Sequence, residues 1–178
     1  QVETLSALQK HRDEGNNRGL VVYATGVGKT YLGAFDTKNL KAKRILFIVH
    51  TKAIVKQSRL SFEDIYYNRQ SEFGFFWGND QEISKNFIFS TIQSIGKERN
   101  LKKFSPDHFD YIIVDESHHA AAPSYERIFD YFKPKFLLGL TATPSRMDKK
   151  NILEKFKKTV YEIDEFEAIH RGLLVPFI

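Results

Sequence analysis

Residues 19–30 read GLVVYATGVGKT, and this stretch decides the fold. The apolar residues 20–23 predict a short buried strand, and the glycines that follow predict a tight turn. A helix is expected to begin at Lys29, with Leu32 and Ala34 among the side chains that can pack on a sheet. A strand, a glycine turn and a helix in this order place a helix N-terminus beside the end of a strand.

The turn has the chemistry of a phosphate-binding loop. Consecutive backbone N–H groups can curl around an anion, and the helix N-terminus adds its partial positive charge. Gly26 and Gly28 permit the close approach and the dihedral angles that this needs. Lys29 would reach the β- and γ-phosphates of a nucleotide, and the Thr30 hydroxyl would hold Mg²⁺. The predicted nucleotide-binding residues of this stretch are Thr25, Gly26, Val27, Gly28, Lys29 and Thr30.

One residue departs from the strict phosphate-loop pattern. That pattern begins with glycine, and Tyr23 stands in its place. The alternative interpretation is a glycine turn that joins a strand to a helix and leaves its lysine exposed. The strand before the turn and the helix after it favour the nucleotide site, and sequences further along the chain bear on the choice.

Length and composition limit the class of protein. The chain has 178 residues, 42% of them hydrophobic, which suits one α/β domain with a single core. It contains no cysteine, so disulfides and thiolate metal sites are excluded and a cytoplasmic location is expected. No apolar stretch has the length of a membrane span and no signal peptide is recognised, so no membrane partner is expected. The net charge of +5 and pI ≈ 9.3 favour a polyanionic partner, although a lysine-rich solvated surface has the same composition.

Apolar runs alternate with helical stretches along the whole chain. Strands are predicted at 20–23, 45–49, 73–77 (an edge strand), 87–89, 111–114, 136–140 and 160–163. Helices are predicted at 2–14, from 29, from 53, up to 103, at 125–132, at 146–158 and at 165–178 with a break at Gly172. This alternation predicts an α/β fold, in which a mostly parallel sheet is covered by helices on both faces. Polar sequences follow the strands, where open α/β sheets bind their ligands.

Two carboxylates follow the strand predicted at 111–114. A carboxylate in that place can complete a Mg²⁺–nucleotide site through the water shell of the metal, so Asp115 is assigned to the metal together with Thr30. Glu116 is assigned as the base that polarises the water attacking the γ-phosphate. The alternative interpretation of this pair is an exposed acidic turn after a strand.

Two other groups of side chains suggest chemistry less directly. His118 and His119 resemble half of a zinc site, but the chain has no cysteine and no spaced second pair of ligands. The aromatic residues Phe73, Phe75, Phe76 and Trp77 form a cluster in sequence. This cluster could stack on nucleic-acid bases, but such residues more often belong to a core.

The motifs, in this order, resemble motifs I, II and III of superfamily 2 helicases and translocases. The three are the loop ending Gly28-Lys29-Thr30, the box Asp115-Glu116-Ser117-His118, which is of the DExH kind, and the later Thr141-Ala142-Thr143-Pro144. The chain is most similar to the branch that contains type III restriction-enzyme helicase subunits and related DEAD/DEAH-box DNA helicases. That likeness rests on His50-Thr51-Lys52, on Ser90-Thr91-Ile92-Gln93-Ser94 and on Arg146-Met147-Asp148. The resemblance covers nearly the whole chain, and the branch tolerates Tyr23 in the loop.

The resemblance implies a P-loop NTPase fold with a RecA-like sheet, and ATP and Mg²⁺ as cofactors. Gln1 resembles the glutamine of the upstream motif that recognises adenine. The catalytic residues would be Lys29, Asp115, Glu116 and His118, of which His118 would also link the ATP site to motif III. Thr141 and Thr143 would couple hydrolysis to movement along a strand.

The resemblance also implies contacts to the backbone of one nucleic-acid strand. Thr51 and Lys52 (motif Ia) and Thr91 and Gln93 (motif Ib) would make them, because hydroxyl and amide groups bond phosphate and sugar without reading bases. Thr51 stands where the family pattern leads us to expect arginine, which would weaken the contact. The alternative interpretation is that these four residues cap helices or lie on the solvated surface.

The family needs a second RecA-like lobe, whose arginines complete the ATP site. Nothing after Pro144 supplies that lobe, so residues 1–178 are interpreted as the first motor lobe of a longer protein. The expected function is the ATP-binding lobe of a DNA helicase or translocase. The alternatives are the lobe of an RNA helicase and a nucleotide-switched binding module that does not translocate. A small-molecule phosphotransferase would need an acceptor pocket and a lid, for which the sequence has no signal.

Overall fold

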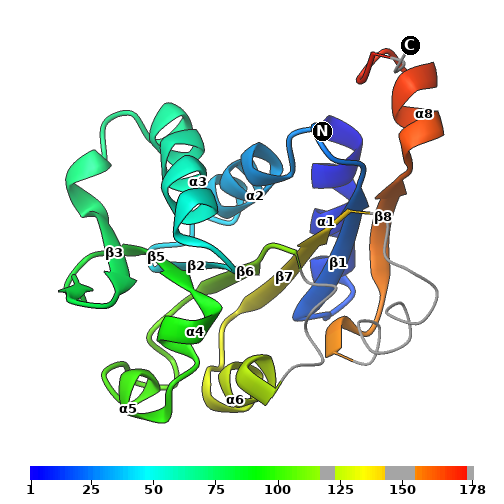
Figure 1. Ribbon diagram of the computed structural model, residues 1–178. Coiled ribbons are helices and arrows are strands. Elements are labelled where there is room, and N and C mark those ends of the chain that lie inside the picture. The colour runs from blue at the N-terminus through cyan, green and yellow to red at the C-terminus, as the bar shows by residue number, and fades with distance from the viewer. Residues whose placement is uncertain (117–122, 143–154, 176–178) are drawn as a thin grey trace.

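The computed structural model describes residues 1–116, 123–142 and 155–175. Figure 1 shows a twisted sheet with helices on both of its faces. Within the described residues the sheet has eight strands in the order β4-β3-β5-β2-β6-β7-β1-β8, and its neighbouring strands are parallel except for β3 and β4. The strands are β1 (Arg18–Tyr23), β2 (Ile45–Val49), β3 (Phe73–Trp77), β4 (Asp80–Gln81), β5 (Phe87–Thr91), β6 (Tyr111–Val114), β7 (Phe136–Thr141) and β8 (Thr159–Ile163).

The helices bury the two faces of the sheet in two separate cores. The helices α1 (Val2–Asp13), α2 (Lys29–Asn39), α3 (Lys52–Ile65) and α8 (Glu165–His170) contribute to one core, and α4 (Ile92–Ile95), α5 (Glu98–Leu101) and α6 (Pro123–Tyr131) to the other. In β1, Val21 and Tyr23 belong to the first core, whereas Leu20 and Val22 belong to the second. Successive side chains of a strand point to opposite faces, so a strand covered on both sides has a continuous apolar sequence. The predicted α/β class is therefore confirmed.

The prediction of one helix up to residue 103 is wrong, because the chain breaks at Gly96. A Cβ atom at Gly96 would lie 2.8 Å from the carbonyl oxygen of Ile92 and 3.2 Å from the Cβ of Ser124. The carbonyl oxygen of Gly96 accepts a hydrogen bond from Arg127 Nε at 2.9 Å. The close approach of α6 thus requires glycine at this point, and α4 and α5 are two short helices.

Most of the remaining helix predictions agree with the structure. The break at Gly172 is confirmed, because α8 ends at His170 and Gly172 has a φ of 68°. The helix predicted at 146–158 lies mostly outside the described residues. None of the helices in the described ranges is long and apolar enough to cross a membrane.

The strand β3 is not the edge of the sheet, contrary to our prediction, because other residues pair with the backbone groups on its outer side. The two-residue strand β4 pairs with its end, and Glu82 covers the part beyond β4. The N–H of Phe75 donates to the Glu82 carboxylate at 2.9 Å, and the carbonyl of Phe75 accepts from the N–H of Glu82 at 3.1 Å. Phe73, Phe76 and Trp77 are buried and Phe75 is half-buried, so the aromatic cluster belongs mainly to the core.

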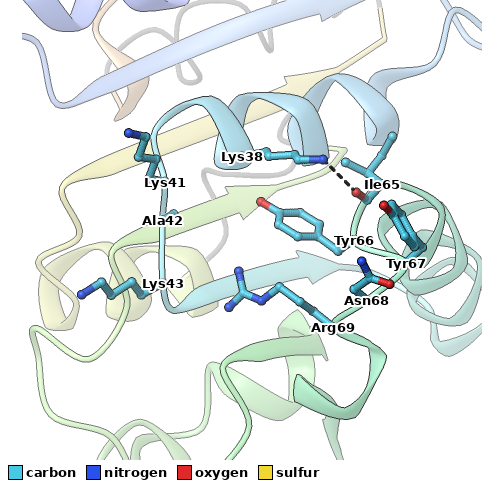
Figure 2. A pocket seen from close by; sticks show the side chains of 9 residues that line it. All are labelled: Lys38, Lys41, Ala42, Lys43, Ile65, Tyr66, Tyr67, Asn68 and Arg69. Carbon is cyan, nitrogen blue, oxygen red and sulfur yellow. Dashed lines mark hydrogen bonds between the residues drawn. The ribbon is translucent and has the colours of Figure 1, made fainter.

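The amino ends of the parallel strands form the edge of the sheet opposite to the phosphate loop. A cavity of about 390 Å³ opens there between the end of α2 and the end of α3, as Figure 2 shows. It is lined by Lys38, Lys41, Ala42, Lys43, Ile65, Tyr66, Tyr67, Asn68 and Arg69. The sequence analysis did not predict this cavity.

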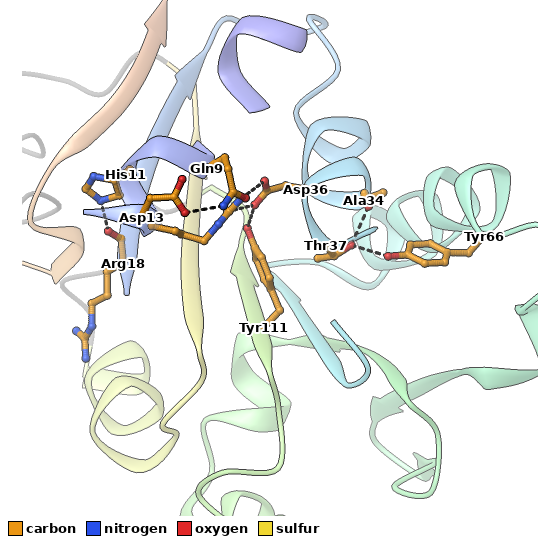
Figure 3. A network of polar contacts seen from close by, with 10 residues as sticks. Gln9, His11, Asp13, Arg18, Ala34, Asp36, Thr37, Tyr66 and Tyr111 are labelled. Atoms are coloured by element: carbon orange, nitrogen blue, oxygen red, sulfur yellow. Dashed lines mark hydrogen bonds and ion pairs between the residues drawn. The ribbon is translucent and has the colours of Figure 1, made fainter. Parts of the chain in front are cut away.

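A buried polar network fastens α1, α2 and β6 to one another (Figure 3). Arg12 of α1 forms two hydrogen bonds with the carboxylate of Asp36 in α2, at 2.7 and 3.0 Å. The hydroxyl of Tyr111, the first residue of β6, donates to the same carboxylate. The exposed fractions of the Arg12 and Asp36 side chains are 8% and 0%, respectively. Burial raises the pKa of Tyr111 well above its usual value, so the phenol stays protonated and remains a donor.

We expect Asp36→Ala to lower the free energy of unfolding by about 3–5 kcal/mol, because it leaves the Arg12 guanidinium buried without a counter-charge. Denaturant unfolding followed by circular dichroism would measure this change. Glu63→Ala is the matched control, since it removes the carboxylate of the partly exposed pair Arg59–Glu63 and should change the free energy by about 1 kcal/mol or less. Equal effects of the two substitutions would contradict a special role for Asp36.

Candidate nucleotide site

The predicted phosphate loop joins β1 to α2 and has the expected backbone shape. Gly26 has a φ of 88° and Gly28 a φ of 91°, values in the left-handed region that favours glycine. A Cβ atom at Gly28 would also lie 2.9 Å from Gln1 Nε2. Gly28 is the N-cap residue of α2, so no capping side chain occupies the first N–H groups of the helix. The loop therefore presents an uncapped helix N-terminus, which attracts anions.

Lys29 folds back over this loop. Its Nζ donates a hydrogen bond to the carbonyl oxygen of Tyr23 at 3.2 Å. Thr30 follows in the first turn of α2 and is half-buried. A phosphate at the helix N-terminus would offer Lys29 a charged acceptor, which forms a stronger hydrogen bond than a neutral carbonyl.

Asp115 is buried at the end of β6, on the same edge of the sheet. It is 5% exposed, and the N–H of Glu116 donates to its Oδ1 at 2.9 Å. The pKa of Asp115 is raised to about 6, mainly by burial; the hydrogen bond from the Glu116 N–H opposes the rise, the charge of Glu116 adds to it, and the charge of Lys29 opposes it. The electrostatic influence of Lys29 links the loop after β1 to the carboxylate after β6, although β7 separates the two strands.

Glu116 has a backbone conformation that is uncommon for a residue with a side chain. Its φ is 54°, in the left-handed region. Such conformations cost about 1–3 kcal/mol and cluster at active sites, where the surrounding structure maintains them. In the described part of the chain, no three histidine, aspartate or glutamate side chains gather into a metal site.

Gln1 lies beside the phosphate loop although 27 residues separate it from Gly28. Its Nε2 is 3.5 Å from the carbonyl oxygen of Gly28. Gln1 is the N-cap residue of α1, and the Arg12–Asp36 pair fastens that helix to α2. The contacts of α1 therefore bring the residue predicted to recognise adenine to the loop predicted to bind phosphate.

The four residues predicted to contact nucleic acid lie at the ends of two adjacent strands, because Val49 of β2 pairs in register with Thr91 of β5. Thr51 is exposed, and its hydroxyl caps α3 by accepting from the N–H of Ile54 at 3.3 Å. Lys52 is exposed, with its Nζ 5.8 Å from the ring centre of Trp77.

The two residues at the end of β5 differ in exposure. Thr91 is 5% exposed, and its hydroxyl donates to Ser94 Oγ at 2.9 Å. Gln93 is exposed on α4. The structure thus places Thr51, Lys52 and Gln93 on the surface, whereas the hydroxyl of Thr91 is engaged inside the protein.

Part of the predicted site lies outside the described residues. His118 and Thr143 belong to that part, as do the second histidine His119 and the run 146–148. Thr141 is described: it is fully buried at the end of β7 and pairs in register with Val22 of β1. The residue assigned to coupling therefore lies beside the strand that carries the phosphate loop.

Two features of the site were missed by the sequence analysis. The hydroxyl of Tyr125 in α6 is 3.0 Å from His50 Nε2 at the end of β2. Burial raises the pKa of Tyr125 well above its usual value, and the charges of Asp115 and Glu116 add to the rise. A cavity of about 540 Å³ also adjoins the loop, lined by Ala24, Thr25, Gly26, Ala142, Glu165, Leu174 and Val175. Both features combine segments that are far apart in sequence, so no local sequence pattern predicts them.

Comparison with known proteins identifies the family. The model of the family described as type III restriction enzyme, res subunit, matches residues 1–146. The chain belongs to this family. The resemblance to restriction-enzyme helicase subunits is therefore confirmed.

Curated relatives match nearly the whole length of this chain. A type I restriction enzyme EcoAI endonuclease subunit of Escherichia coli is 30% identical, over 99% of this chain and 23% of its own length. A putative mitochondrial ATP-dependent helicase, irc3, of Schizosaccharomyces pombe is 33% identical, over 98% of this chain and 30% of its own length. The chain thus spans about a quarter to a third of the length of these relatives.

A solved structure of a related protein has the same fold. A fragment of a putative HsdR subunit of a type I restriction enzyme from Vibrio vulnificus superimposes with a TM-score of 0.69 and 25% identity. The match covers 93% of this chain and 30% of that one. The RecA-like fold that the resemblance implies for this chain is therefore confirmed.

We expect Asp115→Asn to stabilise this chain at neutral pH. The folded chain binds the Asp115 proton with a pKa of about 6 and the unfolded chain with a pKa of about 3.9, so stability present below pH 4 is lost as the pH rises through 6. The substitution removes the buried charge and should raise the free energy of unfolding by about 2 kcal/mol at pH 7.5.

Denaturant unfolding at several pH values would measure this effect, which should shrink as the pH is lowered from 6 toward 4. Asp13→Asn is the control, because Asp13 lies exposed on α1. A gain in stability that does not depend on pH would contradict the assignment to the Asp115 charge.

Proposed function

We propose that this chain is the ATP-binding motor lobe of an ATP-dependent DNA helicase or translocase. The observation that carries the proposal is the meeting of two features at the carboxyl edge of the sheet. One is the uncapped N-terminus of α2 with Lys29, which follows β1, and the other is the buried Asp115, which follows β6, two strands away from β1 in the sheet. A cation and a buried carboxylate at a helix N-terminus suit a nucleotide triphosphate with its Mg²⁺.

Each residue of that arrangement is assigned a chemical role in this proposal. Lys29 would hold the β- and γ-phosphates, and the loop residues 25–28 would surround them with backbone N–H groups. Thr30 and Asp115 would hold Mg²⁺, which when bound neutralises charge on the phosphates. Glu116 would act as the base that polarises the attacking water. Gln1 would contact adenine, since it lies beside Gly28.

We assign the nucleic-acid contacts to the neighbouring strand ends. Lys52 and Gln93 are exposed there and can reach phosphate and sugar, and Thr51 can do so while it caps α3. Thr91 is only 5% exposed, so we assign it to support of the turn after β5 rather than to direct contact with the nucleic-acid strand. Thr141, His118 and Thr143 would couple the nucleotide state to this surface.

DNA is the preferred substrate in this proposal. The relative named DNA 3′-5′ translocase XPB2, from Sulfurisphaera tokodaii, is 28% identical over 86% of this chain. The S. pombe relative is named an ATP-dependent helicase. We propose a second RecA-like lobe in the same full-length protein, since this chain matches 23% and 30% of the two relatives described above. Its arginines would complete the transition-state contacts.

We expect Lys29→Ala to weaken binding of a fluorescent ATP analogue to the chain by about 100-fold, because a charge-assisted contact to phosphate is lost. Glu116→Gln should retain binding but stop turnover in the two-lobe protein. Fluorescence titration with Mg²⁺ and a phosphate-release assay would measure the two effects. Lys10→Ala is the control, as Lys10 is exposed on α1. Normal turnover by Glu116→Gln would refute the assignment of the base.

We expect single- or double-stranded DNA to stimulate the ATPase of the two-lobe protein by about tenfold or more, and RNA to stimulate it less. Lys52→Ala combined with Gln93→Ala should reduce this stimulation and leave the basal rate in place, because both residues lie outside the nucleotide loop. A rate indifferent to nucleic acid would favour the nucleotide-switched module. Stronger stimulation by RNA would favour the RNA helicase.

A further inference from the structure

The cavity at the amino edge of the sheet has no part in the proposed nucleotide site. It lies between the segment that joins α2 to β2 and the segment that follows α3 (Figure 2). The helix α3 begins at Lys52, on the surface proposed for nucleic acid, and ends at Ile65, beside the cavity. Its 14 residues correspond to a length of about 21 Å. The cavity is therefore a separate place on the molecule.

Three exposed lysines give the cavity a positive charge. Lys38, Lys41 and Lys43 line it, and no carboxylate of the described residues forms an ion pair with any of them. Lys38 Nζ donates to the carbonyl oxygen of Ile65 at 3.2 Å, which leaves its charge uncompensated. An uncompensated group of cations beside a cavity attracts anionic ligands.

Nearby carboxylates are already engaged with other groups. Asp110 accepts the backbone N–H groups of Lys43 and Arg44, each at 3.0 Å, and forms an ion pair with Lys135 at 2.9 Å. Glu72 pairs with Arg69, whose hydrogen bonds lower the pKa of Glu72 to about 2. The negative charges at this edge are thus held by groups other than the side chains of the three lysines.

Arg69 forms a wall of the cavity. Its guanidinium lies 5.7 Å from the ring centre of Tyr66 and 4.8 Å from that of Phe87, and Glu72 binds it at 2.6 Å. Tyr66 is buried and donates or accepts a hydrogen bond with Thr37 Oγ1 at 3.0 Å. These contacts hold Arg69 and Tyr66 in place, so that the lysines lie beside a preformed surface.

Tyr67 adds an exposed aromatic ring to the same cavity. It is 67% exposed, although tyrosine rings usually lie at least partly against other side chains. Asn68 beside it is also exposed. Figure 2 shows Lys41 and Lys43 on one side of the cavity, Tyr67 and Asn68 on the other, and Tyr66 between them. This spread of groups suits an extended polyanion with flat bases better than one compact phosphate.

Lys41 has a left-handed backbone conformation, which costs free energy for a residue with a side chain. Its φ is 54°, and it directly follows Leu40, the C-cap residue of α2. The N–H of Ala42 closes the turn by donating to the carbonyl of Thr37 at 3.0 Å. Glycine is the residue that such helix ends favour. A lysine here gives up some stability of the turn and places a charge at the mouth of the cavity.

We propose that this cavity is a second nucleic-acid site, which binds the phosphodiester backbone of a strand through Lys38, Lys41 and Lys43 and stacks a base on Tyr67. The proposal deepens the proposed motor function and rests on it, because it supposes that the chain acts on a nucleic acid. The site differs from the Thr51–Lys52 and Gln93 surface, from which α3 separates it.

Protection of lysines from acetylation tests both surfaces in one experiment. The 178-residue chain is treated with acetic anhydride, with and without a 20-nucleotide single-stranded DNA, and each lysine is quantified by mass spectrometry. We expect the DNA to protect Lys38, Lys41 and Lys43, and to leave Lys10 and Lys158 on the α1–β8 side unprotected. Protection of Lys52 reports separately on the proposed motor surface.

Lys41→Gly combined with Lys43→Ala tests the energetic contribution. We expect about tenfold weaker binding of the labelled strand by fluorescence anisotropy, and a salt slope shallower by about 1.4, as for the loss of two phosphate contacts. The melting temperature should stay the same or rise, because glycine suits the conformation at position 41. Lys10→Ala combined with Lys158→Ala removes the same charge elsewhere and should leave binding unchanged.

Two results would overturn the proposal, and a third would separate it from the proposed motor surface. Protection of Lys52 without protection of the three cavity lysines would retain the motor surface and reject the second site. Displacement of the strand from the cavity by inorganic triphosphate at an equal concentration of phosphate groups would indicate a site for small anions instead. Protection of the cavity lysines without protection of Lys52 would support the second site and reject the proposed contacts at the motor surface.

Discussion

The buried carboxylate of Asp36 is the interaction on which the arrangement of the site depends. Asp36 belongs to α2. Its carboxylate accepts two hydrogen bonds from Arg12 of α1 and one from the hydroxyl of Tyr111 in β6. These three elements each carry one part of the candidate nucleotide site: α1 begins beside Gln1, α2 begins with Lys29, and β6 precedes Asp115. A buried charge is tolerated only where its partners satisfy it, so this carboxylate restricts the three elements to one relative placement. The geometry at the carboxyl edge is thus maintained from within the core.

Much of the site was predictable because its signals are local. The glycine at position 28 and the lysine after it lie next to each other in sequence, and their geometry depends on a single turn. Asp115 was predictable for another reason, since the ends of parallel strands meet at one edge of a sheet whatever the order of the strands. Thr51 was open to two interpretations, and the structure shows that its hydroxyl caps α3, a role that does not prevent contact with a strand.

The remaining features depend on contacts between distant segments. The pairing of Arg12 with Asp36 joins two helices whose sequences give no sign of it, because each residue alone resembles a surface charge. The break at Gly96 results from the approach of α6, and the prediction of a longer helix failed because that approach has no local signature. The cavity at the amino edge likewise combines the end of α2 with the end of α3. The turn at Lys41 has a lysine where glycine is usual, and the positive φ of that residue could not be predicted from its type.

The closed outer side of β3 has a consequence for how the molecule behaves at high concentration. The strand is rich in phenylalanine, and an uncovered strand of this kind would offer unpaired N–H and C=O groups to a second copy. Glu82 occupies the backbone groups of Phe75, and the side chain of Lys85 lies so close to Gly74 that any larger residue would collide with it. Two charged side chains therefore border the most aromatic strand of the sheet. An incoming strand would have to displace them and bury their charges, and this penalty opposes aggregation through that edge.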